Sequence, residues 1–277
     1  MLPRQRQTYI LGRVREDGGV RVGDLARELG VSDMTVRRDL ELLEKQGLLE
    51  KVHGGATAVA GSAVFEPGFA AKSVLQEREK EAIAEAAIRL VSPGMAIGIS
   101  AGTTTHELAR RIVDVPGLTV VTNSFSVADT LHRAASSDCT VILAGGIRTP
   151  SDALVGPFAV AAIRTIHVDL LFMGVHGMDP HSGFTTPNIL EGETNRALVE
   201  AARRLVVVAD HTKWGVVGIS SMARLDEADT VITDDGISDE ARGILGGAIR
   251  ELVVVPVVRP APMPILQAVP DPAPAAE

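Results

Sequence analysis

The N-terminal part of the chain carries a group of side chains that could contact nucleic acid: Ser32, Thr35, Arg37, Arg38, Lys51 and His53. An arginine can donate two parallel hydrogen bonds to a guanine edge or to a phosphate group. Serine and threonine near a helix start can bond to phosphates or base edges, and the helix dipole attracts anions there. A lysine and a histidine in a following loop could reach backbone phosphates. These residue types, in this order, predict contacts with double-stranded DNA.

Hydrophobic periodicity around these residues predicts a helix-turn-helix. Gly30 permits the left-handed conformation that ends a first short helix, and Ser32 can cap the second. Val36, Leu40 and Leu43 recur at helical spacing and form one apolar stripe, so the hydroxyl and guanidinium side chains of this helix point away from it. The first turns of such a second helix enter the major groove. An ordinary helix pair with solvated arginines would have the same pattern, and that alternative stays open at this point.

The winged-helix domain is expected to occupy residues 1–57. Residues 48–56 predict a short strand and a glycine turn, which would form the wing and carry Lys51 and His53. We assign Asp39 to structure, because a carboxylate beside Arg37 and Arg38 is better suited to orienting those arginines than to meeting a phosphate. Residues 58–74 are small, are punctuated by glycine and proline, and are expected to be a linker.

A second set of polar residues follows the apolar runs in the rest of the chain. Its candidate ligand-binding members are Gly102, Thr103, Thr104, Thr105, Asn123, Ser124, Gly145, Gly146, Asp210 and Lys213. Ligands of open parallel sheets bind beyond the carboxyl ends of the strands, so these residues predict a pocket for a polar small molecule. A glycine, three hydroxyls and free N–H groups at a helix start make an anion cradle, and a nearby lysine could supply the cation. Asn123 and Asp210 could bond to sugar hydroxyls. Taken singly, the threonines could simply cap a helix and the glycines simply turn the chain.

Apolar, β-branched runs alternate with helix-like stretches between residues 75 and 257. Strands are expected at 96–99, 118–122, 140–143, 170–173, 205–208, 230–232 and 252–255, and helices within 75–94, 105–113, 127–135, 158–166, 190–203 and 239–250. Strands that are apolar throughout, with helices between them, indicate a mostly parallel sheet covered on both faces. The predicted fold class is therefore α/β, with an N-terminal winged helix-turn-helix and a C-terminal, mostly parallel sheet domain. Residues 258–277 are rich in proline and alanine and are expected to form a disordered tail.

Composition excludes several classes of protein. The chain has 277 residues, enough for two domains, and 45% of them are hydrophobic. Its one cysteine, Cys139, excludes an internal disulfide framework and a multi-cysteine zinc site, and no metal is expected. We find no signal peptide and no apolar run of membrane-spanning length, so a cytoplasmic location without a membrane partner is expected. The net charge of −8 is uneven, because residues 1–60 carry +1 and the remainder −9. Net charge therefore does not argue against DNA binding by the N-terminal part.

Other polar residues are assigned to structural roles. The charged run 77–81 is interpreted as a solvated helix face, and Glu191 as a residue at a helix start that the helix dipole stabilises. Cys139 is expected to begin a buried strand as a small apolar filler. His176 and His211 could line the pocket, but a surface or hydrogen-bonded role is the favoured interpretation.

Two sets of motifs resemble one protein family. The N-terminal set consists of Arg6, Ile10, Val14, Ser32-x-x-Thr35-Val36-Arg37-Arg38-Asp39-Leu40 and His53-Gly54-Gly55-Ala56. It closely resembles the N-terminal signature of the DeoR family of bacterial transcriptional regulators. The second set resembles the sensor domain of that family and consists of Gly102–Thr105, Leu118–Ser124, Gly145-Gly146, Gly156-Pro157, Asp169 with Gly174, Ala209-Asp210 with Lys213, and Val231–Asp234. The resemblance covers roughly residues 4–255.

The resemblance implies a winged-helix DNA-binding domain joined to a sensor domain similar in fold to ribose-5-phosphate isomerase. It implies a repressor of sugar-metabolism genes whose binding to operator DNA is modulated by a phosphorylated sugar, with no cofactor. A homo-oligomer, dimer or tetramer, is expected, because paired winged domains read symmetric half-sites. Two positions depart from the family pattern: Ser100 stands where an aspartate is frequent, and Asn195 where a basic residue is frequent. The change at Ser100 removes a negative charge and favours an anionic ligand, but the identity of the sugar stays open.

Two other functions fit parts of the sequence. A phosphosugar isomerase needs a general base beside the sugar carbon, and related isomerases are acidic in the loop after the strand that ends here at Met173. That loop contains no carboxylate before Asp179, so catalysis is not favoured. A purely structural DNA-binding protein is not favoured either, because the C-terminal part is acidic and its strand ends carry ligand-like loops.

Overall fold

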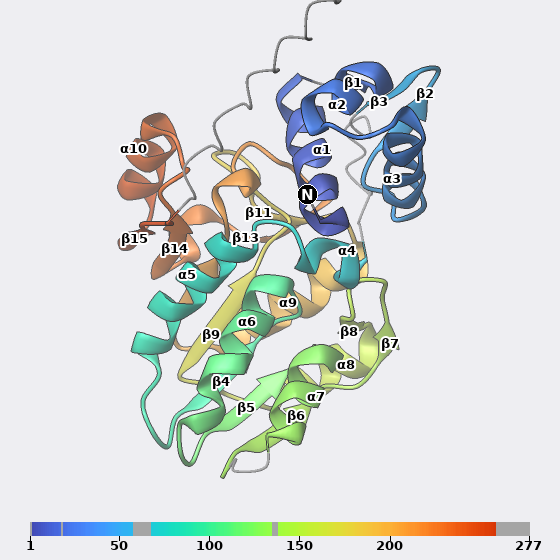
Figure 1. Cartoon of the computed structure of the whole chain (residues 1–277). Coiled ribbons are helices and arrows are strands. Elements are labelled where there is room, and N and C mark those ends of the chain that lie inside the picture. Colours follow the sequence, from blue (N-terminus) through green and yellow to red (C-terminus); the bar gives the residue numbers. More distant parts are fainter. Residues whose placement is uncertain (1, 18, 58–67, 135–137, 259–277) are drawn as a thin grey trace, which may run out of the picture.

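The computed structural model describes residues 2–17, 19–57, 68–134 and 138–258 (Figure 1). The winged-helix part contains α1 (Pro3–Asp17), β1 (Gly19–Arg21), α2 (Val22–Leu29), α3 (Asp33–Lys45), β2 (Glu50–Val52) and β3 (Gly55–Thr57). Its strands form an antiparallel sheet in the order β1-β3-β2. Val36, Leu40 and Leu43 are buried with Leu25 of α2, and Gly30 ends α2 with φ = 62°. The predicted helix-turn-helix and wing are therefore confirmed, whereas β1 and β3 are strands that the sequence did not predict.

Asp39 has the structural role predicted for it, but its partners are not Arg37 and Arg38. Its Oδ2 accepts a hydrogen bond from Arg6 Nε at 2.5 Å, and its Oδ1 accepts from Arg6 Nη2 and Gln7 Nε2 at 3.2 Å each. Asp39 is only 3% exposed and Arg6 only 9%. Adjacent residues on a helix point in different directions, so Asp39 faces α1 while the two arginines face solvent. The ion pair ties α1 to α3.

A seven-stranded parallel sheet forms the centre of the remaining chain. Its strands are β4 (Ala96–Ile99), β5 (Thr119–Thr122), β6 (Thr140–Leu143), β9 (Leu170–Gly174), β12 (Leu205–Val208), β14 (Thr230–Asp234) and β15 (Glu251–Val255). They lie in the order β15-β14-β12-β9-β4-β5-β6, so all seven predicted strands are confirmed. Because β12, β9 and β4 are neighbours in the middle of the sheet, the loops that follow them come together at its carboxyl edge.

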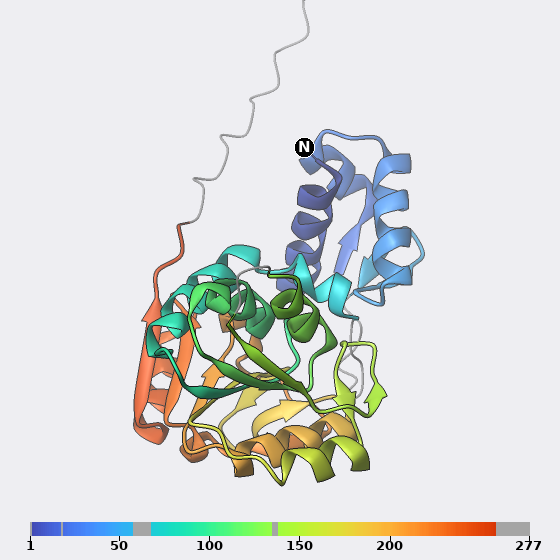
Figure 2. The same cartoon turned by 90° about the horizontal axis from the view of Figure 1, so that it is seen from below.

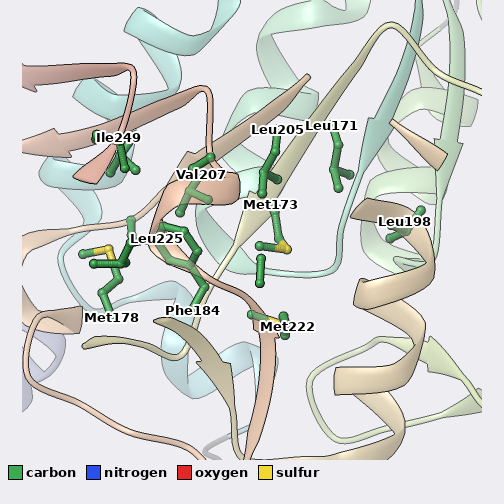
Figure 3. Close-up of a cluster of buried hydrophobic side chains, with 14 of the residues drawn as sticks. Leu171, Met173, Met178, Phe184, Leu198, Leu205, Val207, Met222, Leu225 and Ile249 are labelled. Carbon is green, nitrogen blue, oxygen red and sulfur yellow. The ribbon is translucent and has the colours of Figure 1, made fainter. Parts of the chain in front are cut away.

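Helices cover both faces of this sheet, as predicted. On one face, α5 (Glu77–Ala87), α6 (Thr103–Arg111) and α7 (Phe125–Arg133) bury their apolar residues against the strands. On the other face lie α8 (Pro157–Ile163), α9 (Ile189–Ala201) and α10 (Asp239–Ala248). Figure 3 shows this second cluster, which contains Leu171, Met173 and Val207 of the sheet and Leu198 of α9. Each face thus has its own hydrophobic core.

Short antiparallel strands accompany the large sheet. β10 (Gly177–Asp179), β11 (Gly183–Thr186) and β13 (Ser220–Ala223) form a three-stranded sheet, and β7 (Ile147–Arg148) pairs with β8 (Leu154–Val155). Met178, Phe184 and Met222 of the small sheet are buried in the cluster of Figure 3. The sequence did not predict these strands, because each is too short for its alternation of polar and apolar residues to stand out.

The strand β6 departs from the expectation that every strand is buried. It lies at the end of the sheet order and, among the described strands, pairs only with β5. Ile142 and Leu143 are consequently exposed in part. Cys139 precedes the strand and is half-buried, so the expectation that it begins a buried strand was wrong. An apolar run indicates a strand but does not distinguish a central position from an edge.

The stretch predicted as a linker contains a helix in its second half. Residues 58–67 lie outside the described residues, whereas α4 (Phe69–Ser73) packs against α6. The Phe69 ring meets the His106 ring edge-on at 5.4 Å, and the Phe69 N–H donates to the carbonyl of Pro150 at 3.1 Å. The next helix, α5, begins at Glu77 rather than at residue 75 and is followed by a 3-10 turn, η1 (Ile88–Leu90). Figures 1 and 2 show α4 between the winged-helix part and the sheet domain.

The predicted tail falls almost entirely on residues 259–277, which lie outside the described residues. No helix in the described ranges is long and apolar enough to cross a membrane.

Candidate functional site

The N-terminal half of α3 presents the predicted DNA-contacting side chains. Ser32 caps the helix: its Oγ accepts from the Thr35 N–H at 3.3 Å and lies 2.9 Å from Thr35 Oγ1. Arg37 and Arg38 are exposed and form no side-chain hydrogen bond or ion pair with the described residues. Their guanidinium groups can therefore meet an external anion without breaking an internal contact.

The wing residues differ from each other in their availability. Lys51 lies on β2 and its ammonium forms an ion pair with Glu41 of α3 at 3.3 Å. His53 is exposed in the turn between β2 and β3, where Gly54 adopts φ = 80°. A phosphate contact by Lys51 would compete with Glu41, whereas His53 lies at the exposed tip of the wing.

A pocket lies beyond the carboxyl ends of β4, β9 and β12, and its cavity measures about 70 Å³. Of the residues predicted to bind a ligand, the pocket is lined by Gly102, Thr103, Thr104, Asp210 and Lys213. These residues come from the loop after β4 with the start of α6, and from the loop after β12 with the 3-10 turn η3 (His211–Lys213). The structure thus brings together the first predicted loop and the predicted cation.

Other predicted residues hold that first loop in place instead of lining the cavity. Asn123 is fully buried, and its Oδ1 accepts from the Ala101 N–H at 2.9 Å. Thr105 Oγ1 donates to the carbonyl of Gly102 at 3.0 Å. Ser100, the departure from the family pattern, accepts from the Gly174 N–H at 3.0 Å through its Oγ. These bonds join the loops after β4, β5 and β9.

The structure does not bring Ser124, Gly145 or Gly146 to the pocket lining. Ser124 caps α7 by accepting from the Val127 N–H at 3.2 Å. Gly145 and Gly146 adopt φ values of 73° and 112° in the turn after β6. A side chain on Gly146 would collide with the Val155 carbonyl, at 2.4 Å from its Cβ. The two glycines therefore form a simple turn, which is the alternative that the sequence left open for them.

Two further lysines line the pocket, and the sequence analysis missed both. Lys72 comes from α4 and Lys80 from α5, in stretches interpreted as a linker and as a solvated helix face. Lys80 is only 3% exposed, so the assignment of the run 77–81 to a solvated face was wrong at this position. The available signal was spacing, because Lys80 stands three and seven residues before the buried Ile83 and Ala87 and so shares their helix face.

The charges inside the pocket influence one another. Burial lowers the pKa of Lys80 to about 8, with the Asp210 carboxylate opposing that shift, so the ammonium is still charged at pH 7. Burial also lowers the pKa of His176 to about 4, and the charges of Lys213 and Lys72 act in the same direction. His176 is therefore a neutral lining residue at physiological pH.

Two carboxylates complete the polar lining. Burial alone would raise the pKa of Asp210. The positive charges of Lys213 and Lys80 and the hydrogen bonds that Thr212 donates outweigh burial and lower this pKa, so Asp210 is ionised. Glu191 accepts from Thr149 Oγ1 at 2.6 Å, from Thr186 Oγ1 at 3.2 Å and from Ser151. Its assignment to helix-dipole stabilisation was incomplete, because the side chain lines the pocket and gathers three hydroxyls.

Asn195, the second departure from the family pattern, also lines the pocket. Its amide donates to Met222 Sδ at 3.1 Å, while its buried Oδ1 has no partner among the described residues. His211 is bonded instead to Asp234, with Nδ1 and Oδ2 2.7 Å apart, and is not among the lining residues. No group of three or more His, Cys, Asp or Glu side chains in the described ranges could hold a metal ion.

An exposed arginine pair on a capped recognition helix, joined to an α/β domain with a lysine-lined pocket at its strand ends, defines a DNA-binding regulator with a small-molecule sensor domain. Comparison with known families identifies which one. Residues 6–61 match the DeoR-like helix-turn-helix domain, and residues 75–235 match the DeoR C terminal sensor domain. The chain belongs to the DeoR family of transcriptional regulators.

The chain is similar to curated relatives over most of their length. The chain is 37% identical to the HTH-type transcriptional regulator YgbI of Escherichia coli K12, over 87% of this chain and 93% of the relative. It is 38% identical to the HTH-type transcriptional regulator GlpR of Haloferax volcanii, over 87% and 94%. Among solved structures, ribose 5-phosphate isomerase A of Methanocaldococcus jannaschii is 16% identical over 50% of this chain and 54% of that chain, with a TM-score of 0.38. The relatives and the family models identify a transcriptional regulator, not an enzyme.

Proposed function

We propose that this regulator represses its target genes by binding operator DNA through α3, and that a phosphorylated sugar in the strand-end pocket changes that binding. The observation that carries the proposal is the set of three lysines, Lys72, Lys80 and Lys213, beside the hydroxyl-rich loop at Gly102. An anion that leaves water needs cations and hydrogen-bond donors in exchange. The pocket supplies both, and the ionised carboxylate of Asp210 accepts hydrogen bonds as sugar hydroxyls donate them.

The polar groups divide naturally between the two halves of such a ligand. The phosphate would lie between Lys213, Lys80 and the N–H groups at the start of α6, where the helix dipole adds to the attraction. The hydroxyls would donate to Asp210 and to the buried Oδ1 of Asn195. The asparagine at position 195 leaves this end of the pocket without a further cation, which suits an uncharged sugar ring.

A relative that is 31% identical over 83% of this chain is the transcriptional repressor AccR of Agrobacterium fabrum, which supports repression as the mode of action. Operator DNA of prokaryotes lies in the cytoplasm, so we assign the protein to that compartment. A ligand that binds the DNA-competent and DNA-incompetent states unequally shifts their populations, and the coupling is reciprocal.

A panel of phosphorylated sugars tests the function directly. We expect at least one pentose or hexose phosphate to raise the melting temperature, because a ligand that binds the native state stabilises it. The same compound should change the affinity for a duplex selected by the protein from a random library. Lys213→Ala should weaken binding of that compound roughly 10–100-fold in calorimetry, the range for losing a charge-assisted hydrogen bond of about 1.5–3 kcal/mol.

Arg164→Ala, which removes an exposed charge at the end of α8, is the matched control and should leave both affinities unchanged. Normal ligand binding by Lys213→Ala would remove the lysine from the site, and a chain that selects no duplex at all would refute the proposed function.

The proposed homo-oligomer would use an exposed apolar face of the sheet domain. Phe158 of α8, Ile147 of β7 and Ile189 of α9 are 82%, 60% and 56% exposed. They lie on neighbouring elements, since α8 packs on α9 and β8 contacts both. Large apolar side chains that gather on a surface typically mark an interface between proteins. A second copy of this chain on that face would bring two recognition helices to symmetric half-sites.

Phe158→Asp is expected to yield a smaller species in sedimentation velocity. The dissociation constant of the oligomer should rise at least about 30-fold, because truncating a central aromatic contact costs about 2 kcal/mol or more. Val52→Asp changes an exposed apolar residue of the wing and should sediment like the wild type. An unchanged sedimentation coefficient for Phe158→Asp would rule out this face.

A further inference from the structure

The segment Lys72–Gln76, which we call the junction, belongs to both halves of the molecule. Lys72, Leu75 and Gln76 line the sensor pocket. Leu75 also packs against the hydrophobic core of the winged-helix part. The junction joins the end of α4 to the start of α5, and Gln76 adopts a left-handed conformation with φ = 48° that non-glycine residues seldom adopt. One wall of the pocket is therefore also in contact with the DNA-binding unit.

The Lys80 ammonium holds this wall closed. Its Nζ donates to the carbonyls of Lys72 and Leu75, at 2.5 Å each. These two hydrogen bonds, which we call the clasp, attach the last turn of α4 and the junction to α5. The same ammonium lines the pocket and is close enough to Asp210 and Lys213 to interact with their charges. It can satisfy two neutral carbonyls or it can face an anion in the cavity, and the anion is the stronger partner.

The size of the cavity makes the wall relevant to ligand entry. At about 70 Å³ it is smaller than the roughly 150 Å³ cavity that holds a benzene molecule, and a sugar phosphate is larger than benzene. The opposite walls are fixed to the sheet through the bonds of Asn123 to Ala101 and of Ser100 to Gly174. A ligand seated in the pocket therefore displaces the junction more readily than the strand-end loops.

We propose that the junction transmits the ligand signal: an anionic ligand takes the Lys80 ammonium away from the carbonyls of Lys72 and Leu75, and the released Leu75 shifts the winged-helix unit. This inference rests on the proposed function, since it requires a ligand in the pocket and DNA on α3. Loss of the clasp changes the balance between two orientations of the recognition helix, so ligand and operator bias the same element. By linkage, the operator changes the affinity for the ligand by the same factor.

A double-mutant cycle tests the route without any ligand. Lys80→Met keeps a long side chain but cannot donate to the carbonyls, so it should mimic release of the clasp. We expect it to change the affinity for the selected operator duplex at least tenfold. In the Leu75→Ala background, where the contact with the winged-helix core is removed, the same substitution should change that affinity less than twofold. Such non-additivity is what a shared element produces.

The cycle separates this inference from the proposed function. If wild-type protein selects no duplex, the proposed function itself fails. If wild-type protein binds its duplex and Lys80→Met has no effect, or has the same effect with and without Leu75, the junction is not the route. Circular dichroism confirms that each variant is folded, and Lys80→Leu, which also lacks a donor, replaces the methionine variant if that one does not fold. Glu81→Gln, an exposed neighbour on α5, is the control and should leave operator affinity unchanged.

Discussion

Arg38→Ala is expected to weaken binding of the selected operator duplex by roughly 10–100-fold for each recognition helix that engages the DNA. A bidentate arginine contact contributes about 1–3 kcal/mol of discrimination or affinity. Arg38 is exposed on α3 and makes no competing ion pair with the described residues, so its whole hydrogen-bonding capacity is available to DNA. In a symmetric dimer the loss occurs twice.

Fluorescence anisotropy at fixed salt measures this effect, and its salt dependence identifies the kind of contact. Loss of a phosphate contact lowers the slope of log K against log salt by about one and weakens all sequences alike. Loss of a base contact leaves this slope unchanged but reduces the preference for one DNA sequence over others. Arg89→Ala, at an exposed arginine of η1 in the sensor domain, is the control. Wild-type affinity in Arg38→Ala would exclude this residue from the interface.

Asp39→Ala is expected to have the largest effect on stability. It leaves the buried guanidinium of Arg6 without its carboxylate, and breaking such a buried pair costs about 3–5 kcal/mol. The loss should fall on the winged-helix unit, because Asp39 joins α3 to α1. Asp24→Ala removes the carboxylate of an exposed ion pair with Arg27 in the same unit, and should cost less than about 1 kcal/mol.

Urea unfolding distinguishes the two parts of the chain. Trp214 is the only tryptophan and belongs to the sensor domain, so its fluorescence reports that domain alone. In Asp39→Ala, the helical circular dichroism signal should begin to fall at lower urea than the fluorescence changes. A midpoint equal to that of Asp24→Ala would mean that the Arg6–Asp39 pair is not a main support of the fold.

The seven strands of the large sheet could be predicted because each is a short apolar run between helix-like stretches. Their burial on both faces imposes that composition, so pattern and structure coincide. The edge position of β6 and the three-residue strand β10 could not be predicted in the same way. The first depends on the order of strands in space, and the second, with three residues, is too short for an alternation of polar and apolar residues to stand out.

The candidate site could be predicted in part for the same reason. Gly102, Asp210 and Lys213 follow predicted strands directly, and parallel strands end on one edge of a sheet. Lys72 and Lys80 could not be predicted in this way, because they reach the pocket from helices that precede the first strand of the large sheet, where no strand end points to them. The partner of Asp39 lies 33 residues earlier in the chain, a contact that only the packing of α1 on α3 creates.

The position of β6 at the edge of the large sheet affects how the protein behaves at high concentration. The outer backbone donors and acceptors of β6 face no other strand of the described chain, and Ile142 and Leu143 are partly exposed beside them. Such an unpaired strand can hydrogen-bond to any extended polypeptide through main-chain groups, and this pairing does not depend on the sequence of that polypeptide. Concentrated preparations are therefore most prone to form ribbons and precipitates from this side of the molecule.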